Sequence, residues 1–236
     1  MSEFNWCGYN WLTSERWGQV HPEKTNWWYD EDSVSVDDSN NLILSIKHNP
    51  KYFESLNVTS EMGVGLVSCT EKFKHGIFTI EAKLPKCDFL WPAFWMWSWD
   101  SWPPEIDIFE GYSNEKSSFF KFRILKPLGF WNLQTNVHYN EGVNNKMLGG
   151  KTHFFGFKDP TENFIKYTLD WDKEYLKFYY NGRLVRKVTD KKVLEQLNKT
   201  SMNVIINNGI TNEYKIGSKS DSDFIIKSFE YKNKNC

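Results

Sequence analysis

The stretch HGIFTIEAKL (residues 75–84) decides the fold class, because its apolar side chains recur at every second position. Phe78, Ile80 and Ala82 share one face, and the residues between them are mostly polar. A period of two is that of a β-strand with one buried face. Similar segments occupy residues 41–47, 164–171, 175–180, 183–188, 202–206 and 224–231. The sequence therefore predicts an all-β protein built from many short strands.

The connections between these strands contain polar turns rather than long helices. Asn181-Gly182 joins two predicted strands and is typical of a tight β-hairpin turn. Residues 190–197 are the one stretch with apolar side chains at helical spacing. The segment 119–150 is rich in Gly, Asn and Pro, which predicts long loops at one rim. Because the chain has no linker or repeat, we expect one domain over residues 1–236, folded as a two-sheet antiparallel β-sandwich.

Composition and charge narrow the class of partner. Aromatic residues make up 17% of the chain, including 12 Trp, and the net charge is −1. Such a charge gives no field that gathers nucleic acid or an anionic membrane, so we expect neither as a partner. No apolar run is long enough to span a membrane. The first residues lack the basic and apolar parts of a signal peptide, so none is expected. Action inside a cell or particle and action after export both stay open.

The four cysteines give no sign of a metal site. Cys7, Cys69, Cys87 and Cys236 are irregularly spaced and form no C-x-x-C pair, which argues against bound zinc. One or two disulfides stay open, because the sequence does not fix connectivity. We expect a monomer that needs no cofactor.

The stretch WPAFWMWSWDSWPPEIDIFE (residues 91–110) places three carboxylates close together behind a run of tryptophans. Glu105 and Asp107 have the same parity and would share one face of a strand. Glu110 has the wrong parity, and a β-bulge at Ile108-Phe109 would return it to the acidic face. Alternation with large apolar residues argues against a solvated acidic edge, while a cation site stays open.

Retaining glycoside hydrolysis makes use of such a set of acids. It needs two carboxyls about 5–5.5 Å apart, one ionised as the nucleophile and one protonated as the acid and then the base. A third acid between them helps to keep their protonation states apart. Along an extended strand, the Cα atoms of Glu105 and Glu110 would be ~16 Å apart. The bulge, the strand curvature and the long side chains must therefore bring the two carboxyls together.

The stretch EIDIFE (residues 105–110) resembles the signature of glycoside hydrolase family 16 in its bulged E-x-D-x-x-E form, as in the laminarinase, agarase and carrageenase branches. The resemblance continues, in the family's order, in GLVS (65–68), KFKHGIFTIEAKLP (72–85), WPAFWM (91–96), NVHY (136–139), YTLDW (167–171) and FYYNG (178–182). It implies a jelly-roll, concanavalin A-like sandwich. It also implies an open cleft on the concave sheet, and hence attack within polysaccharide chains.

The resemblance further implies roles for the three acids. Glu105 would be the nucleophile, Asp107 its partner and Glu110 the acid/base. The chain departs from the family pattern just before them. Pro103-Pro104 stands where many members have Gly, and Trp102 lies closer to the first Glu than is usual, so the loop over the cleft differs.

Other residues are candidates for binding a sugar chain. Indole rings stack on the apolar faces of sugars, so we expect Trp95, Trp99 and Trp102 to line the cleft. His138 shares a strand face with other polar residues and would hydrogen-bond the substrate or the acids. Asn207 is a further candidate on a later strand.

Two further expectations concern residues away from these acids. Trp91, at the far end of the tryptophan run, is expected in the core. Some family members carry a structural calcium, for which Asp221 and Asp223 would be candidates here. No catalytic metal is expected.

The sequence thus predicts a retaining endo-glycosidase that acts on a polysaccharide. It would hydrolyse internal β-glycosidic bonds of a β-1,3-glucan, a β-1,3-1,4-glucan or a marine galactan by double displacement. One alternative is a non-catalytic, lectin-like carbohydrate-binding domain, because fold alone does not fix function. Another is a transglycosylase that uses the same residues. A binding domain has no need for all three carboxylates, which favours an enzyme.

Overall fold

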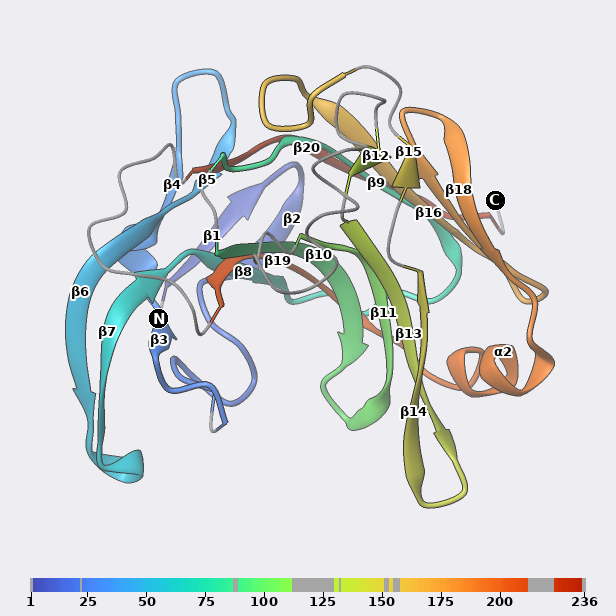
Figure 1. The fold of residues 1–236 in the computed structure, drawn as a ribbon, viewed down its shortest axis with the longest axis horizontal. Helices are drawn as coiled ribbons and strands as arrows, with labels where there is room; N and C mark the ends of the chain where they lie inside the picture. Colours follow the sequence, from blue (N-terminus) through green and yellow to red (C-terminus); the bar gives the residue numbers. More distant parts are fainter. Residues whose placement is uncertain are drawn as a thin grey trace.

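The protein contains two large antiparallel β-sheets that pack face to face (Figure 1). The computed structural model describes residues 2–21, 23–86, 89–111, 130–131, 133–150, 153–154, 158–211 and 223–234. What we call the inner sheet contains, in spatial order, β1 (Glu3–Trp6), β2 (Tyr9–Leu12), β8 (Leu66–Cys69), β19 (Asn203–Ile210), β10 (Leu90–Ser98), β11 (Ser101–Gly111), β13 (Leu133–Glu141) and β14 (Asn144–Gly150). What we call the outer sheet contains β18 (Arg183–Val188), β17 (Leu176–Tyr180), β16 (Ile165–Trp171), β9 (Gly76–Lys83), β20 (Phe224–Lys232), β5 (Leu42–Leu44) and β4 (Val34–Val36).

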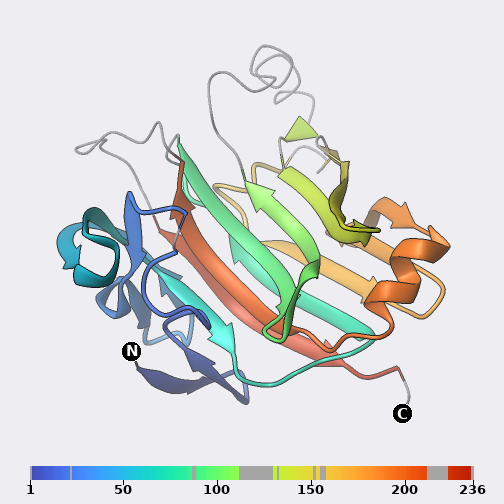
Figure 2. The same ribbon diagram turned by 90° about the horizontal axis from the view of Figure 1, so that it is seen from below.

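Smaller elements surround these sheets. They are the sheet of β3 (Trp27–Tyr29), β7 (Val58–Val64) and β6 (Ile46–Phe53), the pair β12 (Phe130–Trp131) and β15 (His153–Phe154), the 3-10 helices η1 (Glu31–Ser33) and η2 (Glu54–Leu56), and α2 (Lys191–Leu197). The β6–β7 and β13–β14 hairpins both extend below the inner sheet in Figure 1. Figure 2, seen from that side, shows the strands of the inner sheet crossing the view. The prediction of a two-sheet β-sandwich is confirmed.

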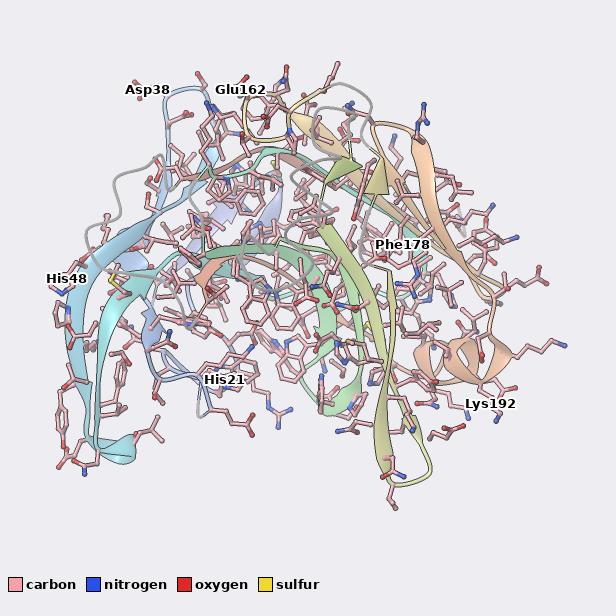
Figure 3. All side chains as sticks on the ribbon, viewed as in Figure 1. His21, Asp38, His48, Glu162, Phe178 and Lys192 are labelled. Atoms are coloured by element: carbon pink, nitrogen blue, oxygen red, sulfur yellow. The ribbon has the colours of Figure 1, made fainter. Side chains whose placement is uncertain are left out.

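Alternating side chains form the core between the sheets. On β9, the apolar residues Phe78, Ile80 and Ala82 are fully buried, as the period of two predicts. Phe178 of β17, labelled in Figure 3, belongs to the same core cluster. Burying one large apolar side chain such as Phe78 contributes about 1.5–3 kcal/mol, as an upper estimate. The summed burial holds the two sheets together.

A second apolar cluster covers part of the other face of the inner sheet. Trp97 of β10 and Ile205 of β19 point into it, together with Trp27 and Tyr29 of β3. Their neighbours along β10 and β19 point into the core between the sheets. β19 is therefore buried along its whole length, because it has apolar cover on both faces.

The turn and helix predictions are confirmed. Asn181 and Gly182 have φ values of 48° and 75° and connect β17 to β18, as expected for a tight hairpin. Helix α2 begins after Asp190, whose side chain accepts hydrogen bonds from the main-chain N–H groups of Lys192 and Val193. Its buried face consists of Val193, Leu194 and Leu197.

The expectation of long loops over 119–150 is wrong for its second half. Residues 133–150 form the β13–β14 hairpin, with a tight turn at 142–143. Glycines and asparagines are tolerated there because β14 lies at the edge of the inner sheet. Of the rest of that segment, residues 130–131 form β12, and residues 119–129 and 132 lie outside the described residues.

Other features bear on expectations about cysteines and membranes. Cys7 and Cys69, the cysteines within the described residues, are free thiols. Asp223 accepts a 2.7 Å hydrogen bond from the Ser45 hydroxyl, and Asp221 falls outside the described residues. In the described part of the chain, we find no helix with the length and apolar character to cross a bilayer.

Candidate active site

A β-bulge in β11 brings the three acidic side chains to one face. Asp107 pairs with Asn136 of β13 and Glu110 pairs with Gln134, so Ile108 and Phe109 together face a single residue. The pairing with β10 shifts at the same place. The bulge predicted from the parity of Glu110 is therefore confirmed. Glu105, Asp107 and Glu110 all line one cleft of about 580 Å³.

Glu105 is held by a tryptophan and faces a histidine. The indole N–H of Trp102 donates a 2.7 Å hydrogen bond to Glu105 Oε2. His138 Nε2 lies 3.7 Å from Glu105 Oε1 and 3.3 Å from Asp107 Oδ2. His138 occupies this position because it pairs with Glu105 across β11 and β13. The prediction that His138 lies beside the acids agrees with this geometry.

Glu110 is held by a second tryptophan and an amide. Trp91 Nε1 donates a 3.1 Å hydrogen bond to one carboxyl oxygen, and Asn136 Nδ2 donates to the other. Gly149 of β14 pairs with Asn136 and leaves room for its side chain. A Cβ atom at Gly149 would lie 2.8 Å from the Asn136 amide oxygen. Each glutamate therefore accepts an indole N–H and has a second polar side chain nearby.

Burial raises the pKa of all three carboxyls. The negative charge of Asp107 raises the pKa of Glu105 further, and that of Glu110 raises the pKa of Asp107 further. At Glu110, the hydrogen bonds from Asn136 and Trp91 oppose the effect of burial. The cluster therefore keeps protons at pH values where exposed carboxyls have lost theirs.

Aromatic rings line the cleft beside the acids. Trp95 pairs with Asp107 and donates a 2.8 Å hydrogen bond to Asn207 Oδ1, and both residues line the cleft. The Trp97 ring stacks on Trp95 at an interplanar angle of 20°. Trp102 lies at the rim and is 49% exposed. Trp95, Trp102 and Asn207 are thus brought together as expected.

The structure places two tryptophans differently from the expectation. The expectation of Trp91 in the core is wrong, because its ring lines the cleft and its N–H reaches Glu110. Trp91 has the same strand parity as Ala93, which pairs with Glu110. Trp99 is not among the residues that line the cleft. It packs against the second apolar cluster, and its indole N–H faces the buried carboxyl of Glu15.

One wall of the cleft comes from a segment that the sequence pattern did not single out. The connection from β2 to β3 contributes Arg16, Trp17, His21 and Lys24. Lys24 Nζ lies 4.1 Å from the centre of the Trp91 ring. His21, labelled in Figure 3, lies on the open side of the inner sheet. The segment has no periodic pattern, so only its mixture of basic and aromatic residues could have suggested it.

Part of the acidic cluster has the geometry of a metal site. Three possible ligand atoms, one from each of Glu105, Asp107 and His138, lie within 4.8 Å of one another. Carboxylate and imidazole groups suit several divalent ions. The same groups serve acid–base chemistry without a metal, so the expectation of a metal-free site stays a prediction.

Known proteins with similar sequences include an enzyme and a binding protein for β-1,3-glucans. The glucan endo-1,3-beta-glucosidase A1 of Niallia circulans is 24% identical over 184 residues, which is 74% of this chain and 25% of that protein. The beta-1,3-glucan-binding protein of Penaeus monodon is 27% identical over 118 residues, 48% of this chain and 31% of that protein. The chain thus spans about a quarter to a third of the length of these relatives.

Solved structures share the fold. The laminarinase catalytic domain of Thermotoga maritima MSB8 superposes with a TM-score of 0.69 at 18% identity, over 88% of this chain and 82% of that one. Residues 21–222 match the family described as "Glycosyl hydrolases family 16", which is most of the chain. The chain therefore belongs to glycosyl hydrolase family 16.

Proposed function

We propose that this protein is a retaining endo-glucanase that cleaves internal bonds of a β-1,3-glucan or a β-1,3-1,4-glucan. The observation that carries the proposal is the bulge in β11, which gathers Glu105, Asp107 and Glu110 in one cleft. Membership of family 16 supports it. So does the similarity to the glucan endo-1,3-beta-glucosidase A1 of Niallia circulans.

In the proposed first step, the Glu105 carboxylate attacks the anomeric carbon. The bond from that carbon to the glycosidic oxygen breaks, and Glu110 gives its proton to the departing oxygen. In the second step, ionised Glu110 takes a proton from water, whose oxygen attacks the same carbon. The ester bond to Glu105 then breaks, and the configuration at the anomeric carbon is retained overall.

Asp107 would set the charge of Glu105. The hydrogen bond between the two carboxyls raises the pKa of Glu105 and lowers that of Asp107, so taken alone it would leave the shared proton on Glu105. The Asp107 side chain is 1% exposed and that of Glu105 is 17% exposed. Burial and the charge of Glu110 act the other way at Asp107, and the Trp102 N–H favours the ionised form of Glu105. We propose that these effects together keep the proton on Asp107, because ionisation costs more at the less exposed group. Glu105 is then ionised, and it accepts hydrogen bonds from the Asp107 hydroxyl and from the Trp102 indole N–H.

The aromatic walls supply affinity for a neutral sugar chain. Trp95 and Trp102 present ring surface in the cleft, and Asn207 supplies an amide near them. Stacking of indoles on sugar faces needs no charge on the substrate. It therefore suits an unsubstituted glucan better than a sulfated galactan.

The decisive test compares Glu105→Gln with Glu81→Gln on a panel of polysaccharides, with release of reducing ends as the readout. Glu81 lies on the outer sheet in ion pairs with Lys166 and Lys227, so the same change there is a matched control. We expect Glu105→Gln to abolish turnover of β-1,3-glucan or mixed-linkage glucan while it still folds and binds. Glu81→Gln should keep full activity, and an active Glu105→Gln variant would refute the assignment.

A second variant tests the acid/base. Glu110→Ala should lose activity on polysaccharide yet regain it with azide on an aryl glycoside, because a good leaving group needs little protonation and azide attacks the ester to Glu105 without a general base. A wild type that binds glucan without releasing reducing ends would indicate a binding protein. Larger products in the presence of an oligosaccharide acceptor would indicate a transglycosylase.

A chelator should leave the activity unchanged, and a loss of activity would point to a metal at Glu105, Asp107 and His138.

A further inference from the structure

The bulge that aims Glu110 turns two consecutive residues of β11 toward the core. Ile108 and Phe109 are both fully buried and both belong to the cluster between the sheets. Successive residues of a regular strand point to opposite faces, so the main chain at this point departs from the strand geometry. Any contact that stabilises this bulged main chain therefore also fixes the direction of the Glu110 side chain.

A tyrosine from the opposite sheet reaches this main chain. The Tyr180 hydroxyl on β17 donates a buried 2.9 Å hydrogen bond to the carbonyl oxygen of Ile108. Tyr180 is 1% exposed, and its ring packs edge-on against Tyr167, whose ring in turn contacts Phe109. The hydroxyl therefore has little freedom to leave the bulge.

Strand β13, which pairs with the bulged part of β11, is held by the same outer-sheet hairpin, β17–β18. Thr135 of β13 is the residue that faces Ile108 and Phe109 across the bulge. Arg186 of β18 donates a 2.9 Å hydrogen bond to the Thr135 hydroxyl and another to its main-chain carbonyl. The β17–β18 hairpin thus contacts both sides of the irregular pairing.

We propose that Tyr180 is a positioning residue for Glu110, because its hydroxyl holds the bulge that turns this side chain into the cleft. The inference rests on the proposed function. Without the hydroxyl, the Ile108 carbonyl stays buried and loses a hydrogen bond, which favours relaxation of the bulge. A shift of one residue in a strand sends a side chain to the other face of the sheet.

The effect should fall on Glu110 and not on Glu105. Glu105 and Asp107 precede the bulge. They pair with Trp97 and Trp95 of β10 in the part of β11 before the irregularity begins. A loosened bulge would therefore weaken protonation of the leaving group while the nucleophile stays in place. A general loss of stability would instead lower all activities together.

The test compares Tyr180→Phe with Tyr231→Phe. Tyr231 also donates its hydroxyl to a main-chain carbonyl, that of His75 at 3.1 Å, away from the cleft. On β-1,3-glucan, Tyr180→Phe should lower kcat roughly tenfold or more with KM little changed, since small misplacement of an acid is costly. On a dinitrophenyl β-glucan oligosaccharide, whose leaving group needs little protonation, kcat/KM should stay near wild type, because it reports only the steps up to release of that group. Tyr231→Phe should be normal on both.

Equal losses of kcat/KM on both substrates, or the same pattern for Tyr231→Phe, would overturn the proposal. Hydrogen exchange of the main-chain amides over residues 106–111 gives an answer that does not need activity. Exchange there should be faster in Tyr180→Phe than in wild type, and unchanged in Tyr231→Phe. Unchanged exchange in Tyr180→Phe would refute the inference. A wild type inert on every glucan would instead refute the proposed function, and the exchange measurement would still decide the role of Tyr180.

Discussion

The indole N–H of Trp102 donates a 2.7 Å hydrogen bond to Oε2 of Glu105, three residues further along the same strand. Trp102 is 49% exposed, so one side chain presents a ring to solvent and a donor to a buried carboxylate. The hydrogen bond favours the ionised form of Glu105, and thus lowers its pKa against the effect of burial. Trp102 therefore has two separable contributions, one to charge and one to stacking.

Trp102→Phe and Trp102→Ala should separate these contributions. The Phe variant keeps a ring but loses the N–H, so the pKa of Glu105 should rise and the acid limb of the kcat/KM profile should move to higher pH. The Ala variant should also bind β-glucan oligosaccharides more weakly, by roughly 1–2 kcal/mol, because the stacking surface is gone. Dissociation constants are measured by calorimetry in a Glu110→Ala background. Equal affinity of the Phe and Ala variants would show that the ring does not bind sugar.

Lys24 should tune the pH dependence from across the cleft. Burial raises the pKa of Glu110, while Asn136, His138, Trp91 and Lys24 lower it. Lys24→Met removes one of the lowering charges, so the basic limb of the kcat/KM profile should move to higher pH. The shift should shrink in high salt, because Lys24 is exposed and its charge is screened.

A matched control is available for this change. Lys51 Nζ also lies over an indole, 4.5 Å from the centre of the Trp28 ring, but neither residue lines the cleft. Lys51→Met should therefore leave both limbs of the profile in place. A profile for Lys24→Met that overlays wild type at low salt would show that this lysine has no influence on Glu110.

Strand periodicity predicted most of the fold, and one break in it predicted the site. The wrong parity of Glu110 indicated a bulge at Ile108-Phe109, because a buried acid needs the same face as its partners. The same parity argument applies to Trp91 and would have placed it in the cleft. The expectation of a core position gave too much weight to its distance from the acids along the chain.

Contacts between distant segments could not be predicted in this way. Tyr180 and Ile108 are 72 residues apart, and no local pattern links a hairpin tyrosine to a carbonyl of another sheet. The cleft wall formed by Arg16 and Lys24 comes from a connection without periodicity, which carries no signal about its neighbours. Glu15 is a single acid whose burial depends wholly on the packing of other segments.

Glu15 is buried beside Trp97, a residue that lines the cleft. It is 3% exposed, and its carboxyl accepts a 2.8 Å hydrogen bond from Ser68 and a 3.1 Å bond from the Arg16 main chain. Burial raises its pKa from 4.5 to about 7, although these bonds and the N–H groups of Trp97 and Trp99 act in the opposite direction. The folded protein thus binds this proton more tightly than the unfolded chain does.

Glu15→Gln should therefore flatten the pH dependence of stability. Because the folded pKa of about 7 lies above the unfolded value of 4.5, the wild type should lose stability as the pH rises between these values, with no further loss from this group above them. Between pH 5 and pH 8 the loss from Glu15 amounts to roughly 2–3 kcal/mol. Gln has no titratable proton; its amide oxygen can accept the Arg16 N–H while its amide N–H donates to the Ser68 hydroxyl. The other buried carboxyls affect both proteins alike. Urea unfolding at the two pH values measures the difference, and parallel losses in wild type and Glu15→Gln would show that Glu15 stays ionised throughout.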